Sequence, residues 1–175
     1  PIYPRSGSQF SLSLELTPPY SIFNNKDYDN LDDQEKYKLL EYNKFKFNGT
    51  WYSALLGDLV FRSHFEFGFL GTYNNEVGLP PFERFFVGGD GLSGYSIDGR
   101  EVIALRGYPN GSLSEDGGDA IYNKYNIELR YPISLNPNST IYALIFGEAG
   151  NSWANYNNFK AFELRKSAGL GIRIF

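Results

Sequence analysis

The 175-residue sequence contains no cysteine, no methionine and only one histidine. Without cysteine there are no disulfides and no thiolate ligands, and a lone imidazole is a poor basis for a zinc site. We therefore expect no metal centre and no cofactor. The chain also lacks a basic cluster and has a net charge of −4, which argues against a nucleic-acid partner.

Long apolar runs are missing as well. No stretch has the length of a transmembrane helix, and no signal peptide is present. Because the chain has no initiator methionine and keeps strand-like alternation up to Phe175, we expect it to be an excerpt of a longer protein. This test does not exclude membrane-spanning strands, since each needs only about 9–11 alternating residues.

What the sequence does contain is many phenylalanines and tyrosines, together with segments in which polar and apolar residues alternate. Alternation with a period of two predicts a strand whose two faces meet different environments. In the clearest segment, Phe65 and Phe67 fall on one face, whereas His64 and Glu66 fall on the other. The predicted strands are Ser8–Thr17, Lys44–Leu56, Leu59–Tyr73, Ala120–Ile133, Thr140–Trp153 and Leu164–Phe175.

The connections between these strands alternate between long and short. Gly57-Asp58 is predicted to be a two-residue turn and Asn136–Ser139 another short turn, because both are rich in turn-forming residues. The first long connection is expected to hold a short helix within residues 32–43, with Asp32 or Asp33 as its N-cap. Short turns on one side and long loops on the other are typical of outer-membrane barrels, while a soluble β-sandwich is the alternative.

Two features favour the barrel. The apolar faces are crowded with aromatic rings, and strands of about ten or more residues exceed the usual five or six. We therefore predict an all-β fold, an antiparallel transmembrane β-barrel of which about six strands are present. The residues expected to face lipid are Phe10, Leu12, Leu14, Phe65, Phe67, Phe69, Ile127, Leu129, Leu170 and Ile172.

The chain also contains a glycine-rich connection of about 45 residues, 74–119, which is far longer than an ordinary loop. Loops of this length are normally functional or disordered. Its many apolar residues, such as Phe85, Phe86 and Ile103, argue against disorder, because they give the segment much to bury. We expect an ordered loop that folds back inward onto the sheet.

Candidates for chemistry are few. Ser63 and His64 are neighbours on a strand, so their side chains point to opposite faces and are a poor nucleophile and base pair. Glu128 and Glu148 lie on neighbouring strands, as a glycosidase carboxylate pair would, but nothing else resembles a sugar cleft. The glycines of residues 88–94 do not open a helix, so a phosphate-binding loop is not indicated. We assign no catalytic residue and do not expect an enzyme.

Arg106 directly follows the apolar run 102–105 inside the long loop. An arginine in a packed environment generally pairs with carboxylates, because its planar guanidinium bonds them through two nitrogens. From the pattern alone, an exposed loop arginine is the other possibility. Glu128 and Glu148 each lie eight to nine residues from the turn at 136–139, so we expect them at about the same height, with Arg106 between them.

Four segments carry a resemblance: FFVGGDGLSGY, ALRGY, NIELRYPI and IFGEAGNSW. They resemble the bacterial surface antigen barrel of BamA-type outer-membrane assembly factors, over nearly the whole chain. In that family a long extracellular loop folds into the barrel, and an arginine at its tip meets acidic residues of neighbouring strands. Leu105, Arg106, Gly107 and Tyr108 match the tip motif, and Glu128 and Glu148 match the acidic positions.

One feature departs from the family pattern. The glycine pair Gly88-Gly89 is followed first by Leu92–Tyr95, a version of the motif without arginine, and only Arg106 supplies the charge.

The resemblance implies a role in the outer membrane of Gram-negative bacteria, folding and inserting other β-barrel proteins. It implies that residues 1–175 are a fragment of one C-terminal β-barrel domain. The implied partners are membrane lipid, unfolded outer-membrane client proteins, and periplasmic assembly lipoproteins that would bind through domains missing here. A two-partner-type secretion transporter barrel is the alternative within the superfamily, and an unrelated outer-membrane porin or enzyme is the alternative outside it.

Overall fold

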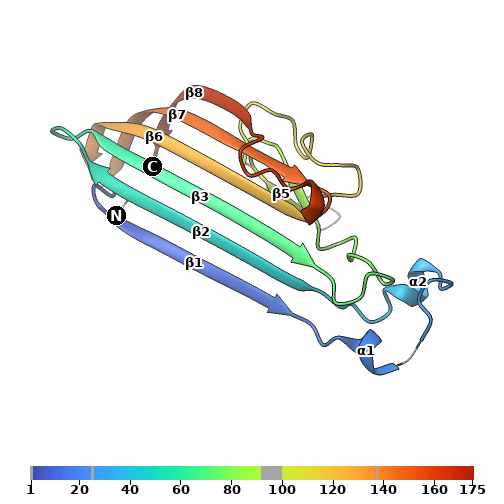
Figure 1. Cartoon of the computed structure of the whole chain (residues 1–175). Coiled ribbons are helices and arrows are strands. Elements are labelled where there is room, and N and C mark those ends of the chain that lie inside the picture. Colours follow the sequence, from blue (N-terminus) through green and yellow to red (C-terminus); the bar gives the residue numbers. More distant parts are fainter. Residues whose placement is uncertain (1, 25, 92–99, 137) are drawn as a thin grey trace.

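The computed structural model describes residues 2–24, 26–91, 100–136 and 138–175. Within these ranges the chain forms one large antiparallel sheet and a small pair of strands in the long loop (Figure 1). The elements of the large sheet are β1 (Gly7–Leu16), β2 (Asn43–Ala54), β3 (Val60–Gly71), β6 (Ile121–Asn136), β7 (Ser139–Trp153) and β8 (Arg165–Ile174). The others are α1 (Tyr20–Asn24), α2 (Asp33–Lys36), β4 (Phe85–Val87), β5 (Glu101–Ile103) and the 3-10 helix η1 (Tyr156–Asn158).

The sheet order is β1-β2-β3-β6-β7-β8, so each strand pairs with the next one along the chain apart from the excursion of the long loop. All five pairings are antiparallel. The alternation in the sequence therefore predicted all six strands, with their ends correct to within three residues. The sheet is curved but does not close on itself, as expected for about six strands of a larger barrel.

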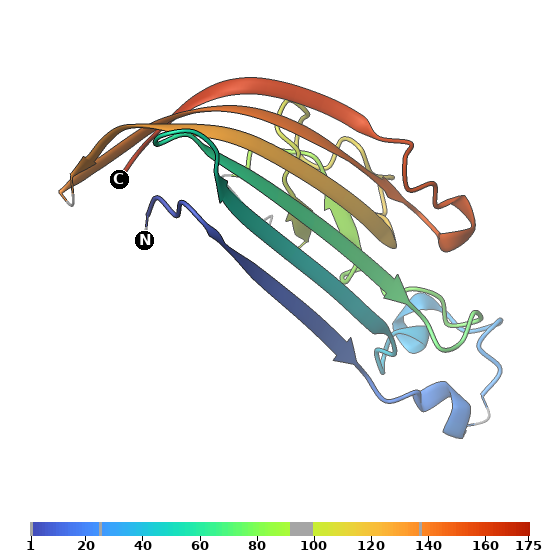
Figure 2. The ribbon, with the colours of Figure 1, turned by 60° about the vertical axis from the view of Figure 1, so that its left-hand side comes forward.

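The two faces of this sheet differ in the way the alternation predicts. On the outer, apolar face, side chains such as Phe10, Ile127 and Leu170 are 54–78% exposed. On the inner face, charged side chains such as Glu128 and Arg130 are buried. Figure 2 shows the strands as an arch, with β4, β5 and their flanking loops beneath its concave side. Most of the apolar set predicted to face lipid thus points away from the protein, as a membrane-spanning sheet requires and a sandwich core does not. Phe67 and Phe69 are on the same face but are partly buried in a cluster that includes Trp153.

The long loop does fold back onto the inner face. β4 and β5 pair in parallel, and the ring of Phe85 on β4 meets the ring of Tyr122 on β6 edge-on. A cluster joins apolar loop residues to two residues of the sheet, and each of its members is at most 6% exposed. The members are Leu70, Phe85, Val87, Ile103, Leu105 and Tyr122. Fully burying one such side chain stabilises a protein by about 1.5–3 kcal/mol, so this cluster stabilises the docked loop.

The local predictions for two connections are confirmed. The short helix α2 lies within 32–43, and its N-cap is Asp32, whose carboxylate accepts a 2.8 Å bond from the amide of Glu35. The β2–β3 turn is the predicted one. The amide of Leu59 donates a 3.0 Å bond to the carbonyl of Leu56, so Gly57 and Asp58 are the two central residues of a β-turn, with Gly57 in the left-handed region at φ 57°.

The register of the β6–β7 hairpin changes at one point. Near the turn, Leu135 pairs with Thr140, but beyond a bulge between Pro132 and Ser134 the pairing is displaced by one residue. One residue of β6 is therefore extra, as in β-bulges generally.

No helix in the described part of the chain has the length and apolar character needed to cross a membrane.

Candidate functional site

The tip of the long loop is held against three strands through all four residues of its motif. Leu105 is fully buried in the apolar cluster described above. Gly107 has φ 91°, and a Cβ there would approach the Cβ of Ser167 on β8 to 3.2 Å, so only glycine fits without strain. The hydroxyl of Tyr108 donates a 2.9 Å bond to the carbonyl of Lys166, also on β8.

Arg106 makes its main contact with Glu148 of β7. Its Nε and Nη2 donate to Oε1 of Glu148 at 2.9 and 2.7 Å, and its backbone amide donates to Oε2 at 2.8 Å. The guanidinium carbon also lies 3.5 Å from the centre of the Phe146 ring. Both oxygens of one carboxylate are thus used to fix both the backbone and the side chain of a single loop residue.

Glu128 of β6 is the second carboxylate, and only 1% of its side chain is exposed. Its Oε1 lies 3.2 Å from Nη2 of Arg106, while its Oε2 accepts bonds of 2.8 and 2.6 Å from Nε and Nη2 of Arg130. Arg62 and Arg173 approach at 3.7 and 3.6 Å. Four arginines converge on this carboxylate, so it is held as an anion at the centre of a cationic group.

The two carboxylates are not at the same height, and the expectation that they would be was wrong. Glu148 pairs with Asn126, whereas Glu128 pairs with Phe146, so the two glutamates are diagonal neighbours. The count from the turn, eight residues for Glu128 and nine for Glu148, already gives an offset of one residue, and the bulge between Pro132 and Ser134 adds a second. Asn126 fills the place beside Glu148 and donates a 3.1 Å bond to its Oε1.

A second group of charges attaches the loop to β2, on the same inner face but nearer the β1 edge of the sheet. Nζ of Lys44 on β2 is 2.9 Å from Glu101 of β5 and 3.1 Å from Glu83, and Nζ of Lys46 is 3.0 Å from Glu101. The Lys44 side chain is only 4% exposed. The loop is therefore attached by ion pairs both at β2 and at β6 and β7.

At the end of the loop, Asp119 exchanges two 2.9 Å backbone bonds with Phe85, which closes its base. The Asp119 side chain is buried, and its Oδ1 has no hydrogen-bond partner among the described residues. Burial raises the pKa of this carboxyl above its ordinary value.

The chain as a whole matches the family model for the Omp85 superfamily domain, over residues 1–174. The chain belongs to the Omp85 superfamily. This superfamily includes BamA-type assembly factors and the transporters of two-partner secretion, and its members lie in the outer membrane of Gram-negative bacteria. A search among curated proteins found no match to the chain.

Within this Omp85 chain, the structure brings Leu105, Arg106, Gly107 and Tyr108 together with Glu128 and Glu148. The functional role of these residues stays a proposal. The arginine-free version of the motif, Leu92–Tyr95, lies outside the described residues. The glycine pair before it lies beside the arginine motif instead, since the amide of Gly89 bonds the carbonyl of Tyr108 at 2.9 Å.

Sequence reasoning missed the anchor formed by Lys44, Glu83 and Glu101, and also the contact of Arg106 with Phe146. The alternation places Lys44 on the polar face, but its partners lie 39 and 57 residues away in the loop. No local spacing connects them. The alternation does place Arg62 and Arg130 on the polar face with Glu128, since Arg130 is on the same strand and Arg62 is on the neighbouring one.

Other polar groups of the inner face form a separate chain of contacts. His64 bonds Thr50 through Nδ1 at 2.7 Å and Glu66 through Nε2 at 2.9 Å, and Lys124 also reaches Glu66. Ser63, its neighbour, pairs with Ile127 and so lies on the outer face. The exposed carboxylates of Asp27, Asp29 and Glu76 come within 4.8 Å of one another, a group that nothing further marks as a metal site.

Proposed function

We propose that this chain is part of a BamA-type factor that folds other β-barrel proteins and inserts them into the outer membrane. The observation that carries the proposal is the arginine at the loop tip, held by two carboxylates of the barrel wall. Such an anchor performs no chemical step. It holds a long extracellular loop against the inner face of the sheet, and so sets the shape of the barrel wall against which a client is assembled.

The energetics support a structural role for this anchor. The two glutamates are nearly inaccessible to solvent, with 1% and 4% of their side chains exposed. Removing a partner from a buried pair typically destabilises a protein by about 3–5 kcal/mol, because it strands a charge. The docked loop is therefore expected to be a permanent part of the barrel.

The location and the partners follow from this proposal. Residues 1–175 are part of a C-terminal barrel domain in the outer membrane of a Gram-negative bacterium. The outer face contacts membrane lipid, and the clients are unfolded outer-membrane proteins. Periplasmic assembly lipoproteins bind through domains outside these residues. A porin is disfavoured, because a docked loop occupies the inner face that an open channel needs.

A reconstitution experiment separates the assembly factor from a secretion transporter. The full-length protein is placed in liposomes and given a urea-unfolded outer-membrane barrel protein or an unfolded secreted passenger. An assembly factor should leave the barrel client folded in the bilayer, detected by its heat-dependent mobility on gels. A transporter should move the passenger across the bilayer into a protease-protected state. Export of passengers without any barrel insertion would overturn the proposal.

The same assay tests the loop anchor. Arg106→Ala should lower client insertion, and Arg106→Lys should restore it only in part, since an ammonium cannot reproduce the two-nitrogen contact. The matched control is Arg5→Ala, which removes an exposed arginine that pairs with Asp58 at the other end of the sheet. Full client insertion by Arg106→Ala would show that the anchor does not serve assembly.

A further inference from the structure

The connection between β7 and β8, residues 154–164, folds over the outer face of the sheet. Nδ2 of Asn123 on β6 donates to the carbonyl of Ala161 at 2.9 Å, and Nδ2 of Asn151 on β7 donates to the carbonyl of Glu163 at 2.8 Å. The two asparagines pair with each other across β6 and β7, in a position that points outward. Their amides are thus covered by this loop rather than left facing the membrane.

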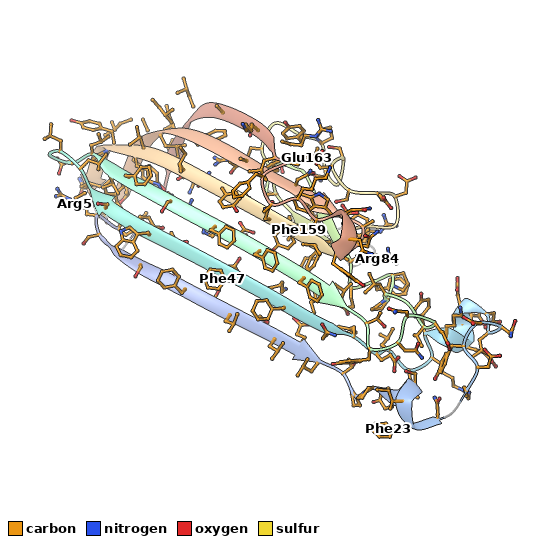
Figure 3. All side chains as sticks on the ribbon, in the orientation of Figure 1. Arg5, Phe23, Phe47, Arg84, Phe159 and Glu163 are labelled. Atoms are coloured by element: carbon orange, nitrogen blue, oxygen red, sulfur yellow. The ribbon has the colours of Figure 1, made fainter. Side chains whose placement is uncertain are left out.

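An aromatic contact fixes the same loop. The Phe159 ring meets Trp153 edge-on with the centres 4.9 Å apart, and it lies 6.2 Å from Phe67 on β3. In Figure 3, Phe159 and Phe47 are both seen in front of the sheet, which is its outer side. The loop therefore covers one end of the outer face, and the rest of that face on β6, β7 and β8 is apolar.

This position is the extracellular border of the apolar band. Towards the short turns, the outward residues next after the asparagines are Tyr125, Ala149 and Lys166, which form one row across the three strands. Beyond that row the outward positions are apolar, including Ile127, Ile145 and Leu170, each more than half exposed. Tyrosine and lysine side chains concentrate where hydrocarbon meets headgroups, because each has an apolar body and a polar end.

The composition of the segment fits that border. Phe162 and Tyr156 are 89% and 67% exposed, although a soluble loop gains nothing by showing such rings. Residues 154–166 contain Lys160, Arg165 and Lys166 against the single acid Glu163, so the segment carries a net charge of +2 in a chain of net charge −4. The Lys160–Glu163 pair is exposed on both sides, so it is weak and does not prevent Lys160 from binding another anion.

We propose that residues 154–166 form a lipid-binding surface in the outer leaflet of the membrane. Phe162 and Tyr156 lie at the boundary between headgroups and acyl chains, and Lys160 and Lys166 bind phosphate groups of anionic lipids. The proposal rests on the outer-membrane location of the superfamily and not on the assembly activity. The two ideas can therefore fail separately.

Hydrogen exchange tests the proposal on the full-length protein in nanodiscs. Discs of phosphatidylcholine alone are compared with discs that also contain diphosphorylated lipid A, and inorganic phosphate is added to the first set in a third arm. Lipid A should slow exchange in residues 154–166, and free phosphate should not. Equal protection by inorganic phosphate, or no protection by lipid A, would overturn the proposal.

The matched variants are Lys160→Gln with Lys166→Gln, and, as a control, Lys26→Gln with Lys38→Gln in the first long connection. All four lysines are exposed, and both pairs change the net charge equally. Each lysine near an anionic surface contributes a factor of about five, so the first pair should weaken lipid A binding roughly 30-fold and the second should leave it nearly unchanged. An equal loss of lipid A binding in both double variants would show that lipid A responds to the net charge of the protein and not to this surface. The variant with Lys160→Gln and Lys166→Gln should still insert clients.

Discussion

Two loops leave the same end of the sheet and fold over opposite faces of it, and their attachments differ in kind. Apart from its apolar cluster, the inner loop, 74–119, is held by ion pairs between its own charged side chains and those of β2, β6 and β7. The outer loop, 154–164, is held by neutral amides that bond its backbone carbonyls, and by rings that meet edge-on. Both loops therefore satisfy polar groups of the sheet, but only one does so with charges.

The difference follows from what each face meets. The inner face is surrounded by protein and polar groups, so a buried carboxylate there can be compensated by several arginines, as Glu128 is. The outer face meets lipid, where an arginine or lysine at the midplane destabilises a barrel by about 2–4 kcal/mol. Neutral asparagines close to the border avoid this penalty, and the carbonyls of the loop provide the hydrogen bonds that lipid cannot.

The largest expected effect is on the inner loop. Arg106→Ala removes the partner of Glu148 and one of the partners of Glu128, which should destabilise loop docking by about 3–5 kcal/mol. We expect rapid proteolytic cleavage within 74–119 in the purified full-length protein, measured by timed digestion. Cleavage within 154–164 should not change, since that loop lies on the other face. Equal loss of protection in both loops would remove the distinction between them.

The second anchor of the inner loop should matter less. Lys44→Ala leaves Glu83 and Glu101 without their most buried partner, but Lys46 still pairs with Glu101. We expect a loss of about 1–3 kcal/mol, the usual penalty of an unsatisfied polar group. Hydrogen exchange of β5 and of residues 83–87 should rise, whereas exchange at the loop tip around Arg106 should stay slow. A tip that is released together with β5 would mean that the two anchors act as one unit.

The outer loop should respond to neutral substitutions. Asn123→Ala together with Asn151→Ala removes both hydrogen bonds to the loop, each of which contributes about 0.5–1.5 kcal/mol. Digestion within 154–164 should become faster while the inner loop keeps its protection. Asn136→Ala, at the opposite end of β6, is the matched control. If the double variant leaves the outer loop protected, the rings of Phe159 and Trp153 are sufficient to hold it.

The smallest effect concerns pH at the base of the inner loop. Because burial raises the pKa of Asp119 in the folded state, the folded protein binds this proton more tightly than the unfolded chain does. The contribution of Asp119 to the free energy of unfolding is greatest below the ordinary pKa of 3.8 and falls as pH rises from there through the raised pKa. Asp119→Asn lacks this titration. The unfolding temperature of the wild type minus that of the variant should therefore decrease across this window and stay constant above it.

The sequence predicted the strands well because alternation is a local signal that repeats for ten or more residues in each strand. It predicted which residues face outward for the same reason, as Phe10 and Leu170 show. It did not predict the β4–β5 pair, since three residues are too few to establish a period. Nor did it predict that the outer loop covers Asn123, because an outward asparagine looks the same in sequence whether a loop or water bonds it.

For the candidate site, the residue types were predictable but the pairing was not. A resemblance to known motifs pointed to Arg106, Glu128 and Glu148, and the structure brings these three together. The height of Glu148 was predicted wrongly because its count from the turn is one residue longer than that of Glu128, and because the bulge next to Pro132 adds one more residue. The anchor at Lys44 depends on contacts between distant parts of the chain, which single-sequence patterns do not contain.

The bulge in β6 also limits how this hairpin can change in length during evolution. Near the turn, Leu135 pairs with Thr140, and that register, continued without the bulge, would put Glu148 opposite Ile127, on the lipid side. The extra residue of the bulge therefore keeps Glu148 on the inner face at the present length of the hairpin. Loss of the codon for that residue would let β6 pair without a bulge and would leave Glu148 opposite Asn126, so the main partner of Arg106 would stay inside. Homologous hairpins that retain the arginine anchor should thus occur in two lengths that differ by this one residue.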